Sequence, residues 1–481
     1  MLTFRACLND LRLDGRHCQS VQDATSLDVF KHHLITDTLM PLTDGVEIWV
    51  GEAADPFGAV EEYDDRARKT TSFVDFDGIR VNATGGRLEP RVTVSRTAGG
   101  TSPLYVSANK SRICISWKFE EAVALLENPQ PNVEICRLIL KHGKGQTREQ
   151  IIQGVFALWP GESMVFNSEG LKFSICENIA VVLPSTFSDR ARATDAFLDA
   201  VAAVLQPLLS RSKRPLLEFS GGMDSTCVAL AASFVRTGLE SYGVIHPGAV
   251  GRQQRMRREE LIEMLGLIDY TGSSSSTLPV QSLRMDECQV TPNDDVYRMC
   301  LMDTLQTHEL QGVDLVMSGI GGDELAKDFT FWRHEWELPG HASRSSIVGS
   351  MSRADMFMRR GIWPVNPLTH PSVVNLCRAM PATIRQNRLF NRFAIARAGL
   401  SDGYMNPRYH ETFANVLMLE AIECDFDQFL DTSILGDFGV LDVSRLLAKT
   451  HAKTELGVPI KLVGKMYYTI KLEMVLRRYV R

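Results

Sequence analysis

Apolar and polar residues alternate in the first part of the chain, which is the pattern of β-strands with one buried face. Such runs, separated by turn residues, occur at residues 46–50, 91–94 and 112–117. Helical spacing interrupts them over residues 120–127 and again from about residue 132 to residue 140. The pattern therefore predicts a β-rich region, with two helices, that ends near residue 185.

The second part of the chain alternates between apolar strands and helices. An amphipathic helix is predicted over residues 195–209, where the apolar residues form one stripe. Apolar strands follow at residues 216–219, 241–247 and 313–317, and helices at residues 226–235, 259–265, 294–308 and 466–479. Strands that alternate with helices are typical of a parallel sheet covered by helices. A serine-rich stretch at residues 271–277 predicts a mobile loop.

The chain is long enough for two domains, each with a core of its own. We place the boundary between residues 188 and 189, next to turn residues 184–186, so that the domains span residues 1–188 and 189–481. The composition is that of a globular protein, with 44% hydrophobic and 23% charged residues in a chain of 481.

Charge and cysteine usage argue against several classes of function. The formal net charge of −6 is unfavourable for binding nucleic acid through its phosphates. The ten cysteines are scattered without a CxxC pair, which argues against a zinc site and a dithiol motif. The N-terminus has no long apolar segment, and no charge-free stretch is long enough to cross a bilayer. We therefore expect a cytoplasmic protein without nucleic-acid or membrane partners.

A glycine-rich turn at residues 220–225 (SGGMDS) lies between an apolar strand and a helix. Glycines let the backbone approach oxygen atoms closely, and the N–H groups at a helix start favour an anion. The hydroxyl groups of Ser220 and Ser225 add donors. Asp224 fits beside a phosphate only with a cation between them, which indicates Mg²⁺. No lysine follows, so the turn is not a GxxxxGK[ST] phosphate loop.

A second turn of this kind lies at residues 318–325 (SGIGGDEL), directly after the strand at residues 313–317. Two such turns at the carboxyl ends of neighbouring parallel strands form the ligand crevice of an open α/β sheet. Asp224 and Asp323 could then hold one Mg²⁺ across the phosphates of ATP. Asp323 and Glu324 are also candidate catalytic residues. The candidate nucleotide-binding residues of the two turns are Ser220, Gly221, Gly222, Asp224, Ser225, Ser318, Gly319, Gly321 and Gly322.

The motifs SGGxDS and SGxGGDEL, in this order, resemble those of the asparagine synthetase and β-lactam synthetase family, which has an ATP-pyrophosphatase fold. Residues 361–374 and 379–381 resemble later segments of that family, and residues 103–119 and 151–162 resemble its glutamine amidotransferase domain. The resemblance implies an α/β protein: an N-terminal glutaminase-like (Ntn-type) α+β sandwich, followed by an adenine-nucleotide α-hydrolase-like parallel-sheet synthetase domain. It also implies that the adenosine of ATP lies near Phe219, Val244, Ser318 and Gly319.

The sequence departs from asparagine synthetases at several positions. Their glutaminase cysteine directly follows the initiator methionine, where this chain has Leu2, and Cys7 is internal and lacks the free α-amine that such a nucleophile uses. The N-terminal domain is therefore predicted to be structural, without a catalytic cysteine. His370 replaces the aspartate of a PFLD segment. Tyr404 and Tyr409 match the tyrosine of β-lactam synthetases by residue type only.

A synthetase without glutaminase activity needs another amine. The acyl substrate can supply its own, because an amine held beside an acyl-adenylate reacts at high effective molarity. The chain looks most like lasso-peptide cyclases, which join a peptide's N-terminal amine to an Asp or Glu side chain and release AMP and pyrophosphate. The partners implied are a ribosomal precursor peptide, a leader peptidase and a leader-binding element. The alternatives are a β-lactam synthetase, an ammonia-dependent asparagine synthetase-like enzyme and a non-catalytic nucleotide-binding scaffold.

Two groups of basic residues have two interpretations each. The family places lysines near the C-terminus, where fixed cations stabilise the charge of the departing pyrophosphate. This makes Lys461 the first catalytic candidate and Lys465 the second, unless both are solvated at a helix start. The other group is either a solvated face or a contact for an acidic peptide or a phosphate, and consists of Arg252, Arg255, Arg257 and Arg258.

Replacing Lys461 with alanine should strongly reduce adenylation and leave the fold intact, because the side chain would stabilise only the charge that develops during the reaction. Pyrophosphate release measures the first effect and circular dichroism the second. Unchanged pyrophosphate release in this variant would remove Lys461 from the site.

Overall fold

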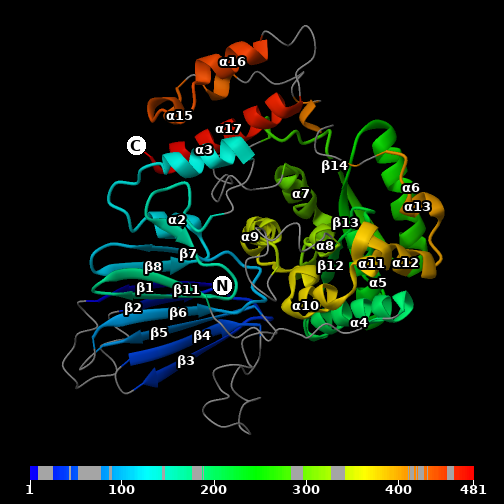
Figure 1. The fold of residues 1–481 in the computed structure, drawn as a ribbon, viewed down its shortest axis with the longest axis horizontal. Coiled ribbons are helices and arrows are strands. Elements are labelled where there is room, and N and C mark those ends of the chain that lie inside the picture. Colours follow the sequence, from blue (N-terminus) through cyan, green and yellow to red (C-terminus); the bar gives the residue numbers. More distant parts are fainter. Residues whose placement is uncertain are drawn as a thin grey trace.

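The fold is that of a computed structural model of the chain (Figure 1). The structure describes residues 1–8, 25–42, 45–52, 77–85, 89–142, 147–175, 187, 189–282, 296–326, 342–409, 411, 416–418, 420, 427–430, 432–451 and 460–480. Statements about the structure refer to these residues.

The N-terminal part folds into two antiparallel sheets, with the helices α2 (Phe119–Val123) and α3 (Val133–His142) beside them (Figure 1). The strand order in one sheet is β2 (Thr25–Val29), β1 (Leu2–Cys7), β8 (Arg112–Ser116), β7 (Tyr105–Ala108) and β9 (Val155–Ala157). The order in the other is β11 (Gly170–Ile175), β10 (Glu162–Asn167), β6 (Arg91–Arg96), β5 (Gly78–Thr84), β4 (Gly45–Gly51) and β3 (Thr36–Leu42). The predicted strands at residues 46–50, 91–94 and 112–117 are thus confirmed as β4, β6 and β8.

The C-terminal part is built on a parallel sheet. Its strand order is β14 (Ile268–Ser273), β13 (Glu240–Ile245), β12 (Pro215–Glu218), β15 (Leu315–Met317) and β16 (Trp363–Val365). The helices that precede α9 are α4 (Arg190–Leu209), α5 (Met223–Val235), α6 (Gly248–Leu265), α7 (Arg298–Leu305) and α8 (Gly322–Leu325). Those that follow are α9 (Arg344–Met358), α10 (Pro371–Ala379), α11 (Ala382–Arg385), α12 (Leu389–Arg397), α13 (Asp402–Met405), α15 (Ile434–Asp437), α16 (Val443–His451) and α17 (Ile460–Tyr479).

The predicted alternation of strands and helices in this part is confirmed, with corrections to some boundaries. Helix α6 begins at Gly248, so the basic cluster lies inside the helix and not before it. The serine-rich stretch is not simply a loop, because residues 271–273 form the end of β14 and pair with β13. Helix α17 begins at Ile460, earlier than the predicted start at residue 466. In each case sheet pairing or tertiary packing extends an element beyond its periodic segment.

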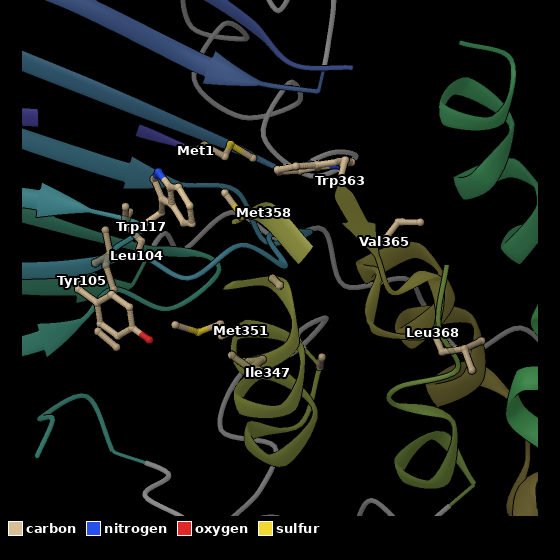
Figure 2. Close-up of a cluster of buried hydrophobic side chains, with 14 of the residues drawn as sticks. Met1, Leu104, Tyr105, Trp117, Ile347, Met351, Met358, Trp363, Val365 and Leu368 are labelled. Atoms are coloured by element: carbon tan, nitrogen blue, oxygen red, sulfur yellow. The ribbon is translucent and has the colours of Figure 1, made fainter. Parts of the chain in front are cut away.

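The two parts share one hydrophobic core, which Figure 2 shows at their junction. Met1 and Trp117 of the N-terminal part lie near Met358 and Trp363 of the C-terminal part. Along α9, Met351 faces Tyr105 of β7 (Figure 2). Met351, Ile347 and Met358 recur at helical spacing and are all buried, so this face of α9 packs against the N-terminal part.

Polar contacts also cross the junction. The indole Nε1 of Trp363 donates a hydrogen bond to Oε1 of Glu52 (2.6 Å). The guanidinium of Arg359 donates two hydrogen bonds, each 2.9 Å long, to the carboxylate of Glu120. Paired donors fix orientation as well as distance. These contacts therefore fix the C-terminal part relative to the N-terminal part.

No helix in the described ranges combines the length and the apolar character that a bilayer span requires.

The pH dependence of stability should carry a contribution from Glu52. Its carboxyl group also accepts a hydrogen bond from the backbone N–H of Asp77 (3.0 Å). Burial, together with the nearby Asp77 carboxylate, raises the pKa of Glu52 from 4.5 to about 7. The folded protein therefore holds this proton more tightly than the unfolded chain, and the stability gained is complete below pH 4.5 and lost as the pH rises through 7.

The variant Glu52→Gln should remove this dependence. From pH 5 to pH 8 the free energy of unfolding of the wild type should fall by about 2 kcal/mol more than that of Glu52→Gln. Urea unfolding at the two pH values measures this. Glu134→Gln, which makes the same change at an exposed position, is the matched control and should keep the wild-type profile. If the free energy of unfolding of Glu52→Gln and of the wild type changed equally with pH, the raised pKa of Glu52 would be contradicted.

Candidate functional site

The site lies at one edge of the parallel sheet, where two adjacent strands end. Strands β12 and β15 pair in parallel, with Leu216 opposite Val316 and Leu217 opposite Met317. The turn after β12 leads into α5, and the turn after β15 leads into α8. Both predicted glycine turns therefore lie at the same edge, as expected for the ligand crevice of an open α/β sheet.

The two turns pack directly on each other, which explains their glycines. Gly221 has a φ of +83°, a conformation that side chains other than glycine rarely adopt. A Cβ on Gly322 would lie 2.3 Å from Cγ of Asp224, so the second turn has room only for hydrogen at this position. The first carboxylate thus lies against the backbone of the second turn.

The two predicted metal-binding aspartates contact the same side chain. Nη1 of Arg388 lies 3.6 Å from Oδ2 of Asp224, and Nη2 of Arg388 contacts Oδ1 of Asp323. Nδ2 of Asn391 donates a further hydrogen bond to Oδ1 of Asp224 (3.2 Å). The Asp224 side chain is 18% exposed and that of Asp323 is 59% exposed, so one carboxylate is enclosed and the other faces solvent.

Burial dominates the electrostatics of Asp224. It raises the pKa of this carboxyl group to about 6, although the Arg388 guanidinium opposes the shift, and the nearby Glu324 adds to it. The arginine therefore compensates only part of the cost of burying the Asp224 carboxylate in its ionised form. The enclosed pocket around Asp224 favours an additional cation.

The backbone that carries Arg388 is strained. Among the described residues, Asn387 (φ 56°) and Arg388 (φ 58°) are the non-glycine residues with positive φ. The left-handed conformation costs roughly 1–2 kcal/mol per residue for L-amino acids. Such strain persists where the surroundings enforce it, often at functional sites. Here it holds the start of α12 against the two turns.

The two carboxylates fit a magnesium ion that arrives with a nucleotide. Within the described ranges no group of three or more His, Cys, Asp or Glu residues could hold a metal ion by itself. Mg²⁺, however, is usually bound by one or two carboxylates together with substrate phosphates and waters. The guanidinium of Arg388 contacts both carboxylates, so Asp224 and Asp323 lie within reach of one cation.

A cavity of about 400 Å³ opens beside the two turns. The predicted residues that line it are Ser220, Gly222, Asp224, Ser225, Val244, Gly319 and Asp323. The hydroxyl groups of Ser220 and Ser225 are hydrogen-bonded to each other (3.2 Å between the oxygens). The hydroxyl of Ser225 also donates to the carbonyl of Gly222 (3.1 Å). The structure thus brings most of the predicted nucleotide-binding residues to one cavity.

Other predicted residues lie behind this surface. Phe219 is fully buried under the guanidinium of Arg258, 5.0 Å from the ring centre, and Ser318 donates its hydroxyl to Asn366. Gly221, Gly321 and Gly322 shape the turns without lining the cavity. Glu324 accepts a hydrogen bond from the hydroxyl of Ser345 (3.0 Å) and is not among the lining residues. Its predicted catalytic role stays untested.

The two lysine candidates remain predictions. Lys461 lies in the first turn of α17, and its side chain is outside the described part of the structure. Lys465 is half-buried on the same helix, which packs beside α3 and α15, and it does not line the described cavity (Figure 1). Neither lysine is therefore placed at the two turns by the described contacts.

The basic cluster divides into two pairs. Arg257 and Arg258 are buried and form ion pairs with Glu411 (3.0 Å) and Asp269, respectively. Arg252 and Arg255 are exposed on α6. Arg257 and Arg258 are therefore structural, whereas the exposed pair is compatible with both a solvated face and a contact for an acidic peptide or a phosphate.

His370 caps a helix. Its ring Nδ1 accepts a hydrogen bond from the backbone N–H of Ser372 (3.3 Å) at the start of α10. The histidine side chain thus satisfies a backbone donor at the helix start, which is the usual role of an N-cap residue. Tyr404 is buried, with its hydroxyl 2.5 Å from that of Thr226, and Tyr409 is partly exposed.

Several cavity residues were not predicted from the sequence. These are Glu218, His246, Gln254, Tyr297, Arg353, Arg388 and Glu411. For Arg388 and Arg353 the sequence offers no local signal. Glu218 and His246 could have been found, because they lie at or directly after the carboxyl ends of the predicted strands β12 and β13.

The wall opposite the aspartates is polar and internally hydrogen-bonded. The hydroxyl of Tyr297 lies 2.7 Å from Nε2 of His246, and burial lowers the pKa of His246, so the ring is neutral near pH 7. Gln254 donates to the carbonyls of Ser220 (3.0 Å) and Val244 (2.8 Å). This wall therefore fixes the first turn and offers neutral polar groups to a ligand.

Comparisons with known proteins identify no family. No family model and no curated protein matches the chain. One similar solved structure is glutamine phosphoribosylpyrophosphate (PRPP) amidotransferase from B. subtilis, complexed with ADP and GMP. It has 10% sequence identity and a TM-score of 0.20, and the match covers 69% of this chain and 72% of that chain. A TM-score this low does not establish a common fold.

The contact between the two turns can be tested with Gly322→Ala. The added methyl group would overlap the Asp224 side chain, and overpacking of this kind costs about 1–3 kcal/mol. Because the displaced group belongs to the site, ATP affinity should fall by roughly tenfold. Equilibrium dialysis with labelled ATP measures this.

The matched control is Gly436→Ala on α15, where an added Cβ would meet its nearest atom, in Ser433, at an ordinary 3.5 Å. This variant should bind ATP like the wild type. Equal ATP affinity in Gly322→Ala and Gly436→Ala would show that the packing of the turns does not shape the site.

Proposed function

We propose that the protein is an ATP-dependent carbon–nitrogen ligase that activates a carboxylate as an acyl-adenylate. One observation carries the proposal. Two glycine turns at adjoining strand ends bring Asp224 and Asp323 within reach of one cation, here the guanidinium of Arg388, beside a cavity. A cation held by two carboxylates next to backbone donors is suited to a triphosphate. The resemblance of both turns to the asparagine synthetase motifs supports the same reading.

The residues of the cavity would share the work of binding. The N–H groups at the start of α5 and the hydroxyls of Ser220 and Ser225 would bind the phosphates. Val244 offers an apolar surface for the adenine ring. Asp224 and Asp323 would hold Mg²⁺, which when bound neutralises charge on the phosphates.

In the first step the substrate carboxylate attacks the α-phosphorus of ATP, and the bond to pyrophosphate breaks. In the second step an amine attacks the acyl carbon of the adenylate, the C–N bond forms, AMP leaves and the amine gives up its proton. Arg353, Arg388 and the turn donors are positive or polar groups of the cavity that could stabilise this charge. Fixed groups of this kind lower the barrier because they need no reorganisation during the reaction.

Within this class we propose a lasso-peptide cyclase, in which the amine is the N-terminus of the same peptide and the product is a macrolactam. Its substrate would be a ribosomal core peptide, with a leader peptidase and a leader-binding element as partners. The support is the sequence resemblance. A small-molecule ligase, such as a β-lactam synthetase or an ammonia-dependent enzyme, and a nucleotide-binding scaffold are the alternative outcomes of the test.

The test is pyrophosphate release from ATP with a linear peptide that carries a free N-terminus and an internal Asp or Glu, compared with free amino acids plus ammonia. Asp224→Asn and Asp323→Asn should each reduce the peptide-dependent rate by roughly 100-fold or more, because each removes charge that holds the metal. Mass spectrometry should show a peptide product lighter by one water.

The matched control is Asp195→Asn, which makes the same change at an exposed salt bridge with Arg397. It should keep the wild-type rate. Release only with amino acids would identify a small-molecule ligase, and ATP binding without release under any condition would identify a scaffold. Full activity in both Asp224→Asn and Asp323→Asn would contradict the proposed site.

A further inference from the structure

The contacts of Arg388 set it apart from the other basic residues of the described chain. Its two terminal nitrogens reach one carboxylate from each glycine turn, Asp224 and Asp323, and its side chain lines the cavity. We propose that Arg388 is a built-in cation that occupies the metal position before the nucleotide binds and moves to the phosphates when the metal arrives. The inference rests on the proposed nucleotide site.

Charge balance gives a reason for such a residue. The described cavity wall carries four carboxylates, on Glu218, Asp224, Asp323 and Glu411. The guanidinium groups against them are those of Arg353 and Arg388 and of Arg257, the ion-pair partner of Glu411. The formal sum is therefore −1, and without Arg388 it would be −2. An anionic wall repels a triphosphate, and the repulsion grows as water is excluded. Arg388 reduces this repulsion at the point where the phosphates would enter.

Geometry makes the arginine and the metal competitors. Nη1 and Nη2 of Arg388 lie at Oδ2 of Asp224 and Oδ1 of Asp323, and a metal ion shared by the two residues would need oxygen atoms of these same carboxylates. Both cations cannot occupy one position. Once displaced, a guanidinium can bind phosphate oxygens with two parallel hydrogen bonds. Asn391, which also donates to Asp224, would keep that carboxylate in place during the exchange.

The backbone suggests how the residue can be removed without unfolding the protein. Arg388 has a φ of 58°, where glycine is the relaxed residue. The variant Arg388→Gly therefore deletes the guanidinium and relieves the backbone at the same time. Arg388→Gln serves as a second variant, because it keeps a side chain of similar length without the charge.

The experiment measures Mn²⁺ binding by electron paramagnetic resonance without nucleotide, in the wild type, Arg388→Gly and Arg388→Gln. Mn²⁺ is titrated high enough to occupy a weak site formed by two carboxylates and water. Both variants should bind Mn²⁺ roughly tenfold or more tightly than the wild type, because the competing cation is gone. Adding Asp323→Asn to Arg388→Gly should abolish the gain. Metal-free ATP should bind both single variants more weakly than the wild type.

The matched control is Arg397→Gln, which removes the same charge at the other end of α12. Arg397 forms an exposed ion pair with Asp195 of α4, away from the two turns. It should keep wild-type Mn²⁺ affinity. Equal Mn²⁺ affinity in the wild type, Arg388→Gly and Arg388→Gln would overturn the inference, as would an equal gain in Arg397→Gln.

The outcome also separates this inference from the proposed function. Wild-type protein that binds ATP and Mn²⁺ together, with no change in Mn²⁺ affinity when Arg388 is removed, would refute the role of Arg388 alone. Tighter Mn²⁺ binding in both variants, with no ATP binding in any form of the protein, would support the shared cation position and refute the ligase.

Discussion

The site depends on the parallel pairing of β12 with β15. Because both strands run in the same direction and are direct neighbours, the turns that follow them leave the sheet at one edge. Their backbones then approach so closely that Gly322 has no room for a side chain beside Asp224. One inserted strand would move the two turns apart by a further strand spacing, about 5 Å. No single cation could then contact both.

The second constraint is charge inside a partly enclosed cavity. Asp224 is buried enough for its pKa to rise in spite of the arginine beside it, so the site retains a deficit of positive charge. Arg388, which contacts this carboxylate, has a left-handed backbone (φ 58°) that costs roughly 1–2 kcal/mol for a residue other than glycine. Asn391 and the neutral pair of His246 and Tyr297 complete the wall without adding charge.

The N-terminal part contributes to this site through packing. Helix α9 buries Ile347, Met351 and Met358 in the core that the two parts share, and it carries Arg353 to the cavity. Arg353 in turn contacts Glu218, the last residue of β12. The antiparallel sheets therefore fix a side chain at the site, a structural role for a region whose sequence resembles a glutaminase domain.

Apolar periodicity and glycine spacing are local properties of the chain, so they predicted the strands β12, β13 and β15 and the two glycine turns. The turns and Val244 supplied the cavity residues that were predicted. Strands β14 and β16 and helix α9 were not predicted, although they complete the C-terminal part. The sequence also did not predict Arg388, Arg353 or the wall of His246, Gln254 and Tyr297, nor the division of the basic cluster into buried and exposed pairs. Only the tertiary structure decided these, because each depends on contacts between segments far apart in the chain, for which the sequence carries no local signal.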